Sequence, residues 1–149
     1  MKTIYIAGPL FSEHEREYLI RLVDILSKEL ELDHNEDFFL PHRDASDLGV
    51  TDGRDEVFCL DLRYLDQAKI VIALLDGPDV DSGTAVELGY AYAKRKKIFG
   101  LLTDFRAYFL STKTPSKLNN MVWGVCDKGN NLYRNIDDLV NAVKIYYNR

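Results

Sequence analysis

The sequence predicts an α/β fold, with a doubly wound, mostly parallel sheet of five strands and helices on both faces. Two observations lead to this prediction. Apolar runs of strand length alternate along the chain with longer segments of helical spacing. The run from Lys69 to Leu75 is apolar after its first residue, as in a parallel strand that is covered on both faces. At 149 residues the chain is too short for two ordinary domains, so we expect a single domain over residues 1–149.

The first two elements are a strand and a helix. Thr3–Ala7 has the composition of a strand, and a Gly-Pro pair beginning at Gly8 ends it. Ser12, followed three residues later by Glu15, forms the pattern of a capping box, which begins a helix. Apolar residues at helical spacing continue this helix to about Leu32.

A short strand and a long loop come next. Phe38–Leu40, directly before a proline, predicts the second strand. The polar segment from His42 to Gly53 is predicted to be a loop, and loops of this length in a compact domain are usually functional or disordered. A helix from about Arg54 to Ala68 then leads to the strand at Lys69–Leu75.

The second half of the chain continues the alternation. A turn cluster precedes a helix from about Ser82 to Arg95, and the strand Ile98–Leu102 follows. The segment from Thr103 to Lys117 lacks periodicity and is predicted to be a loop. A helix from about Ile136 to Tyr147 ends the chain. This order of elements predicts a flavodoxin-like sheet.

Composition excludes several classes of function. A net charge of −5 argues against a nucleic-acid partner, which would require a basic face. No apolar run approaches the length of a membrane span and no leader pattern is present, so we expect a cytoplasmic protein without a membrane partner. Cys59 and Cys126 are expected to be reduced. The three histidines lack the spacing of a helical zinc site, so we expect no metal and no cofactor.

The helix that begins near Ser82 carries the first candidate site residue, Glu87. Among the residues one turn from Glu87, Gly83 and Ala91 have almost no side chain and leave space for a ligand. A helix N-terminus favours an ionised carboxylate, so Glu87 is expected to remain an anion that can act as a nucleophile. It also follows a strand and a loop, where ligands bind in such sheets. The alternative is a glutamate placed only for the helix dipole.

Asp61 is the second candidate, because it falls inside the apolar stripe of its helix. That stripe consists of Val57, Leu60, Tyr64, Leu65 and Ala68. A carboxylate that faces a core must be hydrogen-bonded, paired or protonated, and desolvation raises its pKa, as a general acid requires. The alternative is a buried aspartate that caps the amides of a neighbouring loop.

Glu87 and Asp61 together resemble the carboxyl pairs of glycosidic-bond chemistry, in which two environments separate two pKa values. Tyr5 lies near the end of the first strand and can supply a hydroxyl that orients the nucleophile. The alternative for Tyr5 is an aromatic residue that packs in the core, which strands favour.

Four segments, in order along the chain, resemble the nucleoside 2-deoxyribosyltransferase family. They are Lys2–Phe11, Asp61 with Leu62, Asp81–Tyr90 and Asn119–Gly124. The resemblance is specific because the four matches occur in order and span most of the chain. It implies an enzyme that transfers a 2-deoxyribosyl group between bases, with a 2'-deoxynucleoside and a free nucleobase as partners.

The resemblance also implies roles for individual residues. Glu87 is identified as the nucleophile that attacks the anomeric carbon, and Tyr5 as its orienting partner. Asp61 is identified as the group that exchanges a proton with the departing or arriving base. Phe11 resembles the aromatic residue that packs on the base, with core packing as the alternative.

Asp81 and Asn119 resemble the residues that hold the 5'-hydroxyl of the sugar. In the family the latter residue comes from an adjacent subunit, so the resemblance implies a homo-oligomer. Related enzymes that hydrolyse 5'-monophosphates carry serine at both places. A carboxylate at Asp81 would repel a phosphate, so nucleosides are favoured over nucleotides as substrates.

Five further residues complete the candidates for substrate binding. Arg43 and Asp44 can offer donors and acceptors to a base edge, or they can form a mutual surface ion pair. Met121, together with Trp123, can form a wall that excludes water from the site, or both residues can pack an interface. Gly8 and Gly83 are the two remaining candidates.

Two other functions compete with transfer. The first is hydrolysis of 2'-deoxynucleosides or their 5'-monophosphates, which shares the first half of the reaction. The second is a non-enzymatic nucleotide-binding module of flavodoxin-like fold. A phospho-receiver module needs acidic residues after the first strand, where Gly8–Leu10 stands here, and this counts against it.

Overall fold

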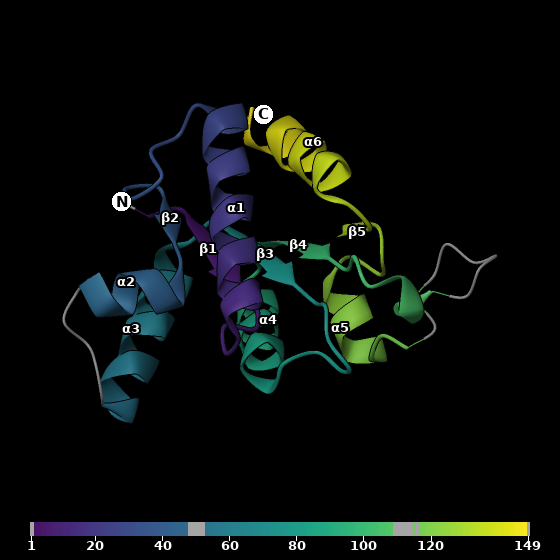
Figure 1. Cartoon of the computed structure of the whole chain (residues 1–149), viewed down its shortest axis with the longest axis horizontal. Helices are drawn as coiled ribbons and strands as arrows, with labels where there is room; N and C mark the ends of the chain where they lie inside the picture. Colours follow the sequence, from purple (N-terminus) through teal and green to yellow (C-terminus); the bar gives the residue numbers. More distant parts are fainter. Residues whose placement is uncertain (1, 48–52, 109–114, 116, 149) are drawn as a thin grey trace.

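A fully parallel five-stranded sheet forms the centre of the structure (Figure 1). The computed structural model describes residues 2–47, 53–108, 115 and 117–148. The strands lie in the order β2-β1-β3-β4-β5, and their bounds are Ile4–Ala7 (β1), Phe38–Phe39 (β2), Ile70–Leu74 (β3), Lys97–Leu101 (β4) and Leu132–Tyr133 (β5). This order confirms the predicted flavodoxin-like fold, and all four pairings are parallel rather than most of them.

Helices cover both faces of the sheet. Their bounds are Glu13–Leu30 (α1), Pro41–Asp47 (α2), Arg54–Gln67 (α3), Ser82–Ala93 (α4), Asn120–Val125 (α5) and Ile136–Tyr147 (α6). The helices α1 and α6 pack on one face, and α3, α4 and α5 pack on the other (Figure 1). Within the described ranges, no helix combines the length and the apolar character needed to cross a membrane.

The alternation of side chains along β1 determines what each face receives. Ile4 and Ile6 pack into the apolar cluster under α1 and α6. Tyr5 and Ala7 point the opposite way, into the cluster under α3, α4 and α5. All four residues are fully buried. Tyr5 therefore faces α4, the helix that carries Glu87.

The start of α1 confirms the predicted capping box. The Glu15 amide donates to Ser12 Oγ, and the Ser12 amide donates to the Glu15 carboxylate at 2.7 Å. The helix ends at Leu30, slightly before the predicted end, because Glu31 adopts a left-handed conformation with φ 56°.

The predicted loop from His42 to Gly53 is wrong in its first part, where α2 forms. Pro41 occupies the first helical position, where a fixed φ favours a helix and no amide donor is lost. The Asp44 carboxylate accepts the Leu40 amide at 2.8 Å and so satisfies a donor at the start of the helix. Residues 48–52 of this predicted loop lie outside the described residues.

Three short elements were not placed by the sequence analysis. The strand β5 has two residues, too few for a periodic signal, and it forms by pairing Leu132 with Gly100 and Tyr133 with Leu101 of β4. The short helix α5 begins at an Asn119 cap. A 3₁₀ turn, Phe105–Ala107, interrupts the predicted loop from Thr103 to Lys117, of which residues 109–114 and 116 lie outside the described residues.

Gly100 generates a prediction about stability. A Cβ atom there would lie 3.0 Å from both Cys126 Sγ and Leu75 Cδ1, so we expect Gly100→Val to lower the free energy of unfolding by about 1–3 kcal/mol. Gly89 of α4 is the control, because a Cβ atom there would meet no described atom within 4 Å. Gly89→Ala should raise the unfolding free energy by up to about 1 kcal/mol. Urea denaturation of both variants measures this, and equal effects would contradict the packing.

Candidate active site

A short hydrogen bond joins β1 to α4 on the face of the sheet that α4 covers. The hydroxyl of Tyr5 donates to Glu87 Oε1 at 2.6 Å. Tyr5 is fully buried, and Glu87 is partly covered. The two residues are 82 positions apart in the sequence, so only the folded sheet brings them together. The structure thus places Tyr5 where it can orient one oxygen of Glu87 and leave the other available.

Burial controls the protonation of Glu87. Burial raises its pKa to about 8, the hydrogen bond from Tyr5 lowers it, and the charges of Asp61 and Asp81 raise it. The expectation that Glu87 remains an anion at neutral pH is therefore wrong for the unliganded protein. The field of a helix falls off within its first turn, and Glu87 lies in the second turn of α4, so desolvation outweighs the dipole.

Asp61 of α3 is the second carboxyl group at this site. Its Oδ1 atom is buried and has no hydrogen-bond partner among the described residues. Burial raises the pKa of Asp61 to about 6, in the direction expected from its place in the apolar stripe. No described amide donates to Asp61, which leaves the alternative of a loop cap without support. A buried oxygen without a partner is available to a ligand.

The site is rich in carboxyl groups and poor in cations. Asp61, Asp81 and Glu87 form no ion pair with any lysine or arginine in the described ranges. Such a site favours a substrate that develops positive charge, as a sugar does when its glycosidic bond breaks. Among the residues that the structure describes, no group of three histidine, cysteine or acidic side chains is arranged to hold a metal ion.

Asp81 caps α4 with one oxygen. Its Oδ2 atom accepts the Thr84 amide at 2.9 Å and the Thr84 hydroxyl at 3.1 Å. A Cβ atom on Gly83 would lie 3.1 Å from this oxygen, so Gly83 permits the close approach. The Oδ1 atom of Asp81 has no partner among the described residues. Thr84 therefore fixes the orientation of Asp81, and the sequence analysis did not single it out. Its third position in the helix, where the amide donates to a capping side chain, could have identified it.

Phe11, Asn119 and Met121 lie at the surface of the chain. Phe11 is 71% exposed and Met121 is 77% exposed, so neither packs in the core. Asn119 is also exposed, and its Oδ1 atom accepts the Met121 amide at 2.9 Å, which begins α5. No hydrogen bond in the described part of the chain joins Asn119 to Glu87 or Asp61. The single chain therefore does not place Asn119 in contact with the two carboxyl groups.

Gly8 has a packing role at the end of β1. A Cβ atom there would lie 3.1 Å from Leu19 Cδ2 and 3.1 Å from Leu74 Cβ. Glycine at this position thus allows α1 and β3 to approach the chain closely, and Gly8 itself remains partly exposed.

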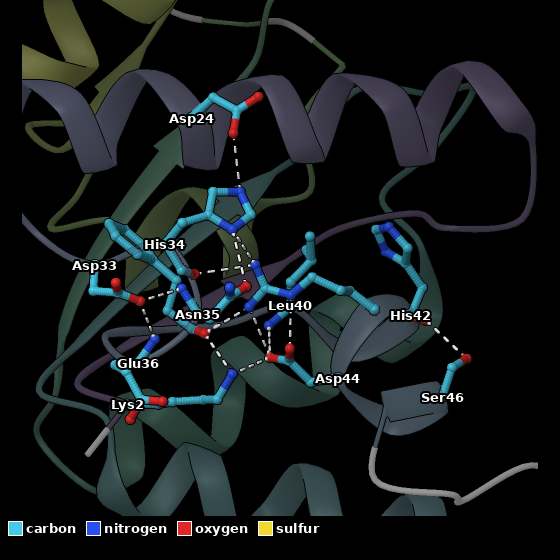
Figure 2. Close-up of polar contacts among 12 residues, drawn as sticks. Lys2, Asp24, Asp33, His34, Asn35, Glu36, Leu40, His42, Asp44 and Ser46 are labelled. Atoms are coloured by element: carbon cyan, nitrogen blue, oxygen red, sulfur yellow. Dashed lines mark hydrogen bonds and ion pairs between the residues drawn. The ribbon is translucent and has the colours of Figure 1, made fainter.

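Asp44 belongs to a buried polar cluster around α2 (Figure 2), and Arg43 pairs with it there. Asp44 is 4% exposed, and both of its oxygens are engaged. Oδ1 accepts Arg43 Nε at 2.7 Å, and Oδ2 accepts Lys2 Nζ and the Leu40 amide, each at 2.8 Å. The structure thus favours the ion pair over contact with a base, and the pair is buried rather than at the surface as expected. Lys2, which also donates to the Phe38 carbonyl at 3.0 Å, was missed because its partners come from distant segments.

Known proteins were compared with this chain. Residues 4–136 match the family model of nucleoside 2-deoxyribosyltransferase. An uncharacterised protein from Ureaplasma parvum is 30% identical, over 95% of this chain and 94% of that protein. A solved structure of a conserved protein from Enterococcus faecalis superposes with a TM-score of 0.80 at 28% identity, covering 98% of this chain and 99% of the other. A 2-deoxyribosyltransferase from Leishmania mexicana has a TM-score of 0.69 at 22% identity, covering 95% and 96%, and shows the same fold.

The buried cluster around Asp44 generates a prediction about stability and pH. Asp44→Ala leaves two cations without their partner, so we expect the unfolding free energy to fall by about 3–5 kcal/mol at neutral pH. Asp66→Ala removes an exposed pair with Lys94 and should cost less than about 1 kcal/mol. Urea denaturation separates the two, and similar losses would contradict a buried role for Asp44.

The pH dependence of the same variant follows from the pKa of Asp44. Burial alone would raise this pKa, but hydrogen bonds from Arg43, Lys2 and the Leu40 amide outweigh burial and lower it. A carboxylate whose pKa is lower in the folded than in the unfolded protein stabilises the fold at pH values above the ordinary aspartate pKa. This contribution is lost as the pH falls through the pKa of the folded protein. The difference between wild type and Asp44→Ala should therefore shrink on acidification.

Proposed function

The chain belongs to the nucleoside 2-deoxyribosyltransferase family, and from this premise we propose that it transfers a 2-deoxyribosyl group between nucleobases through a covalent intermediate on Glu87. Family and fold indicate an activity of the nucleoside deoxyribosyltransferase or N-glycosidase type. The observation that carries the more specific proposal is the 2.6 Å hydrogen bond from Tyr5 to Glu87, together with the buried, unpartnered Oδ1 atom of Asp61.

The proposed reaction consists of two displacements at the anomeric carbon. Glu87 attacks that carbon with its free oxygen, a carbon–oxygen bond forms, and the bond to the first base breaks. A ring nitrogen of the second base then attacks the same carbon and Glu87 leaves. Tyr5 supports this role because its hydroxyl holds Oε1 and so fixes the direction of the other oxygen.

One proton on the carboxyl pair meets the needs of this reaction. Between about pH 6 and about pH 8, the pair of Asp61 and Glu87 holds one proton. Attack requires an ionised Glu87, and the departing base requires a proton. We therefore place the proton on Asp61 when substrate binds. It passes to the departing base and returns when the second base has attacked.

The remaining candidates bind the substrate. Asp81 keeps Oδ1 free to accept a sugar hydroxyl, and its carboxylate disfavours a 5'-phosphate, so the proposed substrates are nucleosides. Phe11, 71% exposed, offers an uncovered ring for stacking on a base. Asn119 and Met121 are exposed on α5, which suits a homo-oligomer in which a neighbouring subunit supplies them to the site.

Base exchange tests the proposed transfer. Incubation with deoxyinosine and adenine should produce deoxyadenosine, detected by liquid chromatography. Glu87→Gln keeps the size of the side chain but removes the nucleophile, so we expect exchange to fall by about a thousandfold or more with binding retained. Glu17→Gln, at an exposed position on α1, is the matched control and should retain full activity. Release of hypoxanthine that is indifferent to adenine, with no deoxyadenosine, would instead favour hydrolysis.

The pH profile tests the role of Asp61. Since the active pair holds one proton, kcat/KM of the wild type should fall below about pH 6 and above about pH 8. Asp61→Asn removes the proton donor and the charge that raises the pKa of Glu87. We expect kcat/KM to fall by at least about a hundredfold. Its decline above about pH 8 should disappear, whereas its decline at acidic pH should remain. Asp55→Asn, on the exposed first turn of α3, is the control. An unchanged profile in Asp61→Asn would remove this residue from proton transfer.

A further inference from the structure

A hollow lies beside the edge strand β5, and its lining includes Trp123 but none of Tyr5, Asp61, Asp81 and Glu87. It has a volume of about 520 Å³, within the range of small-molecule sites. We call it the Trp123 pocket, and the lining residues that matter here are Tyr108, Trp123, Lys128, Asn130, Tyr133 and Arg134. The proposal below does not depend on the activity proposed for Glu87.

The backbone next to Trp123 adopts a strained conformation. Asp127, Lys128 and Gly129 are three successive residues with positive φ, at 53°, 52° and 83°. Two of them are not glycine, and this left-handed conformation costs such residues free energy. A methyl group at Gly129 would overlap the Trp123 indole, so the chain runs directly against this ring. The strained turn thus supports the indole while it places Lys128 and Asn130 at the same pocket.

The charges of the pocket are not balanced by the protein. Lys128 and Arg134 form no ion pair among the described residues. Arg134 lies 3.8 Å above the ring of Tyr108. The only acid that lines the pocket is Asp138, and its Oδ2 already accepts Asn135 Nδ2 at 2.8 Å. On a chain of net charge −5, two unpaired cations beside aromatic rings favour an anionic ligand.

The remaining groups of the pocket favour a planar ring on that ligand. Trp123 and Tyr133 are both partly exposed, so their rings can be stacked upon. The Trp123 Nε1–H donates to no described residue, and Asn130 offers an amide at the pocket. Stacking on aromatic rings, together with amide and N–H donors, is how proteins bind nucleobases.

We propose that the Trp123 pocket binds a nucleoside 5'-monophosphate. The base stacks on the Trp123 and Tyr133 rings, and the phosphate lies between Lys128 and Arg134. The carboxyl-rich site around Glu87 disfavours a phosphate, whereas the cations here attract one. The chain thus carries two sites of opposite charge, one for nucleosides and one for their phosphorylated forms.

Trp123 makes the test direct, because it is the only tryptophan in the chain. Full-length protein is titrated with deoxyadenosine 5'-monophosphate while tryptophan emission is followed on excitation at the red edge of its absorption. Parallel titrations use 2-deoxyribose 5-phosphate and inorganic phosphate, which lack the base, and equilibrium dialysis measures the stoichiometry. We expect a saturable change with one monophosphate per chain, and binding at least about tenfold weaker for the two phosphates that lack a base. No saturable change, or equal affinity for either of these phosphates, would overturn the proposal.

Charge variants locate the site. Lys128→Gln with Arg134→Gln removes both cations and should weaken binding of the monophosphate by about tenfold or more. Arg21→Gln with Lys28→Gln removes the same charge from exposed positions of α1 and should leave the affinity unchanged. If the first double variant does not fold, Lys128→Gln alone serves, because this side chain is exposed. Base exchange should persist in the Lys128 and Arg134 variants, and unaltered affinity in them would refute the assignment.

Discussion

The contact between Tyr5 and Glu87 is the constraint on which the proposed chemistry of this protein depends. Its hydrogen bond joins β1 to α4, while burial raises the pKa of the Glu87 carboxyl group to about 8. Asp61 adds a second desolvated carboxyl group whose charge raises the pKa of Glu87 further. A partly covered acid held by one hydrogen bond, with no described cation beside it, suits the proposed reaction, in which the sugar develops positive charge.

The topology of the sheet explains why this contact forms where it does. With the order β2-β1-β3-β4-β5, the chain reverses its direction of winding between β1 and β3, and ligands of open α/β sheets bind at such a point, outside the carboxyl ends of the strands. Tyr5 lies on β1, and Glu87 lies on the helix that follows β3. The Tyr5–Glu87 hydrogen bond therefore spans the topological switch point, at the place where α/β sheets bind their ligands.

Charge distinguishes the two proposed sites from the buried cluster around Asp44. The site around Glu87 gathers acids without cations, whereas the Trp123 pocket presents Lys128 and Arg134 without paired acids. Between these extremes, Asp44 is surrounded by Lys2 and Arg43, so that its charge is satisfied and holds α2 against β2 (Figure 2). The Glu87 site and the Trp123 pocket leave polar groups available to ligands, whereas the charges around Asp44 stabilise the fold.

The sequence by itself determined the parallel sheet and most of the helices, because apolar periodicity and caps such as Ser12 with Glu15 are local signals. It also singled out Glu87 and Asp61, since a carboxylate among small or apolar residues is recognisable from the sequence. Tyr5 was a candidate through its place in the first strand and through the family resemblance. Only the tertiary structure decided that burial raises the pKa of Glu87 above that of Asp61, that Asp44 is buried, and where the fifth strand lies. These properties depend on desolvation and on partners far away in the chain, such as the residue 82 positions from Tyr5, and no local pattern encodes them.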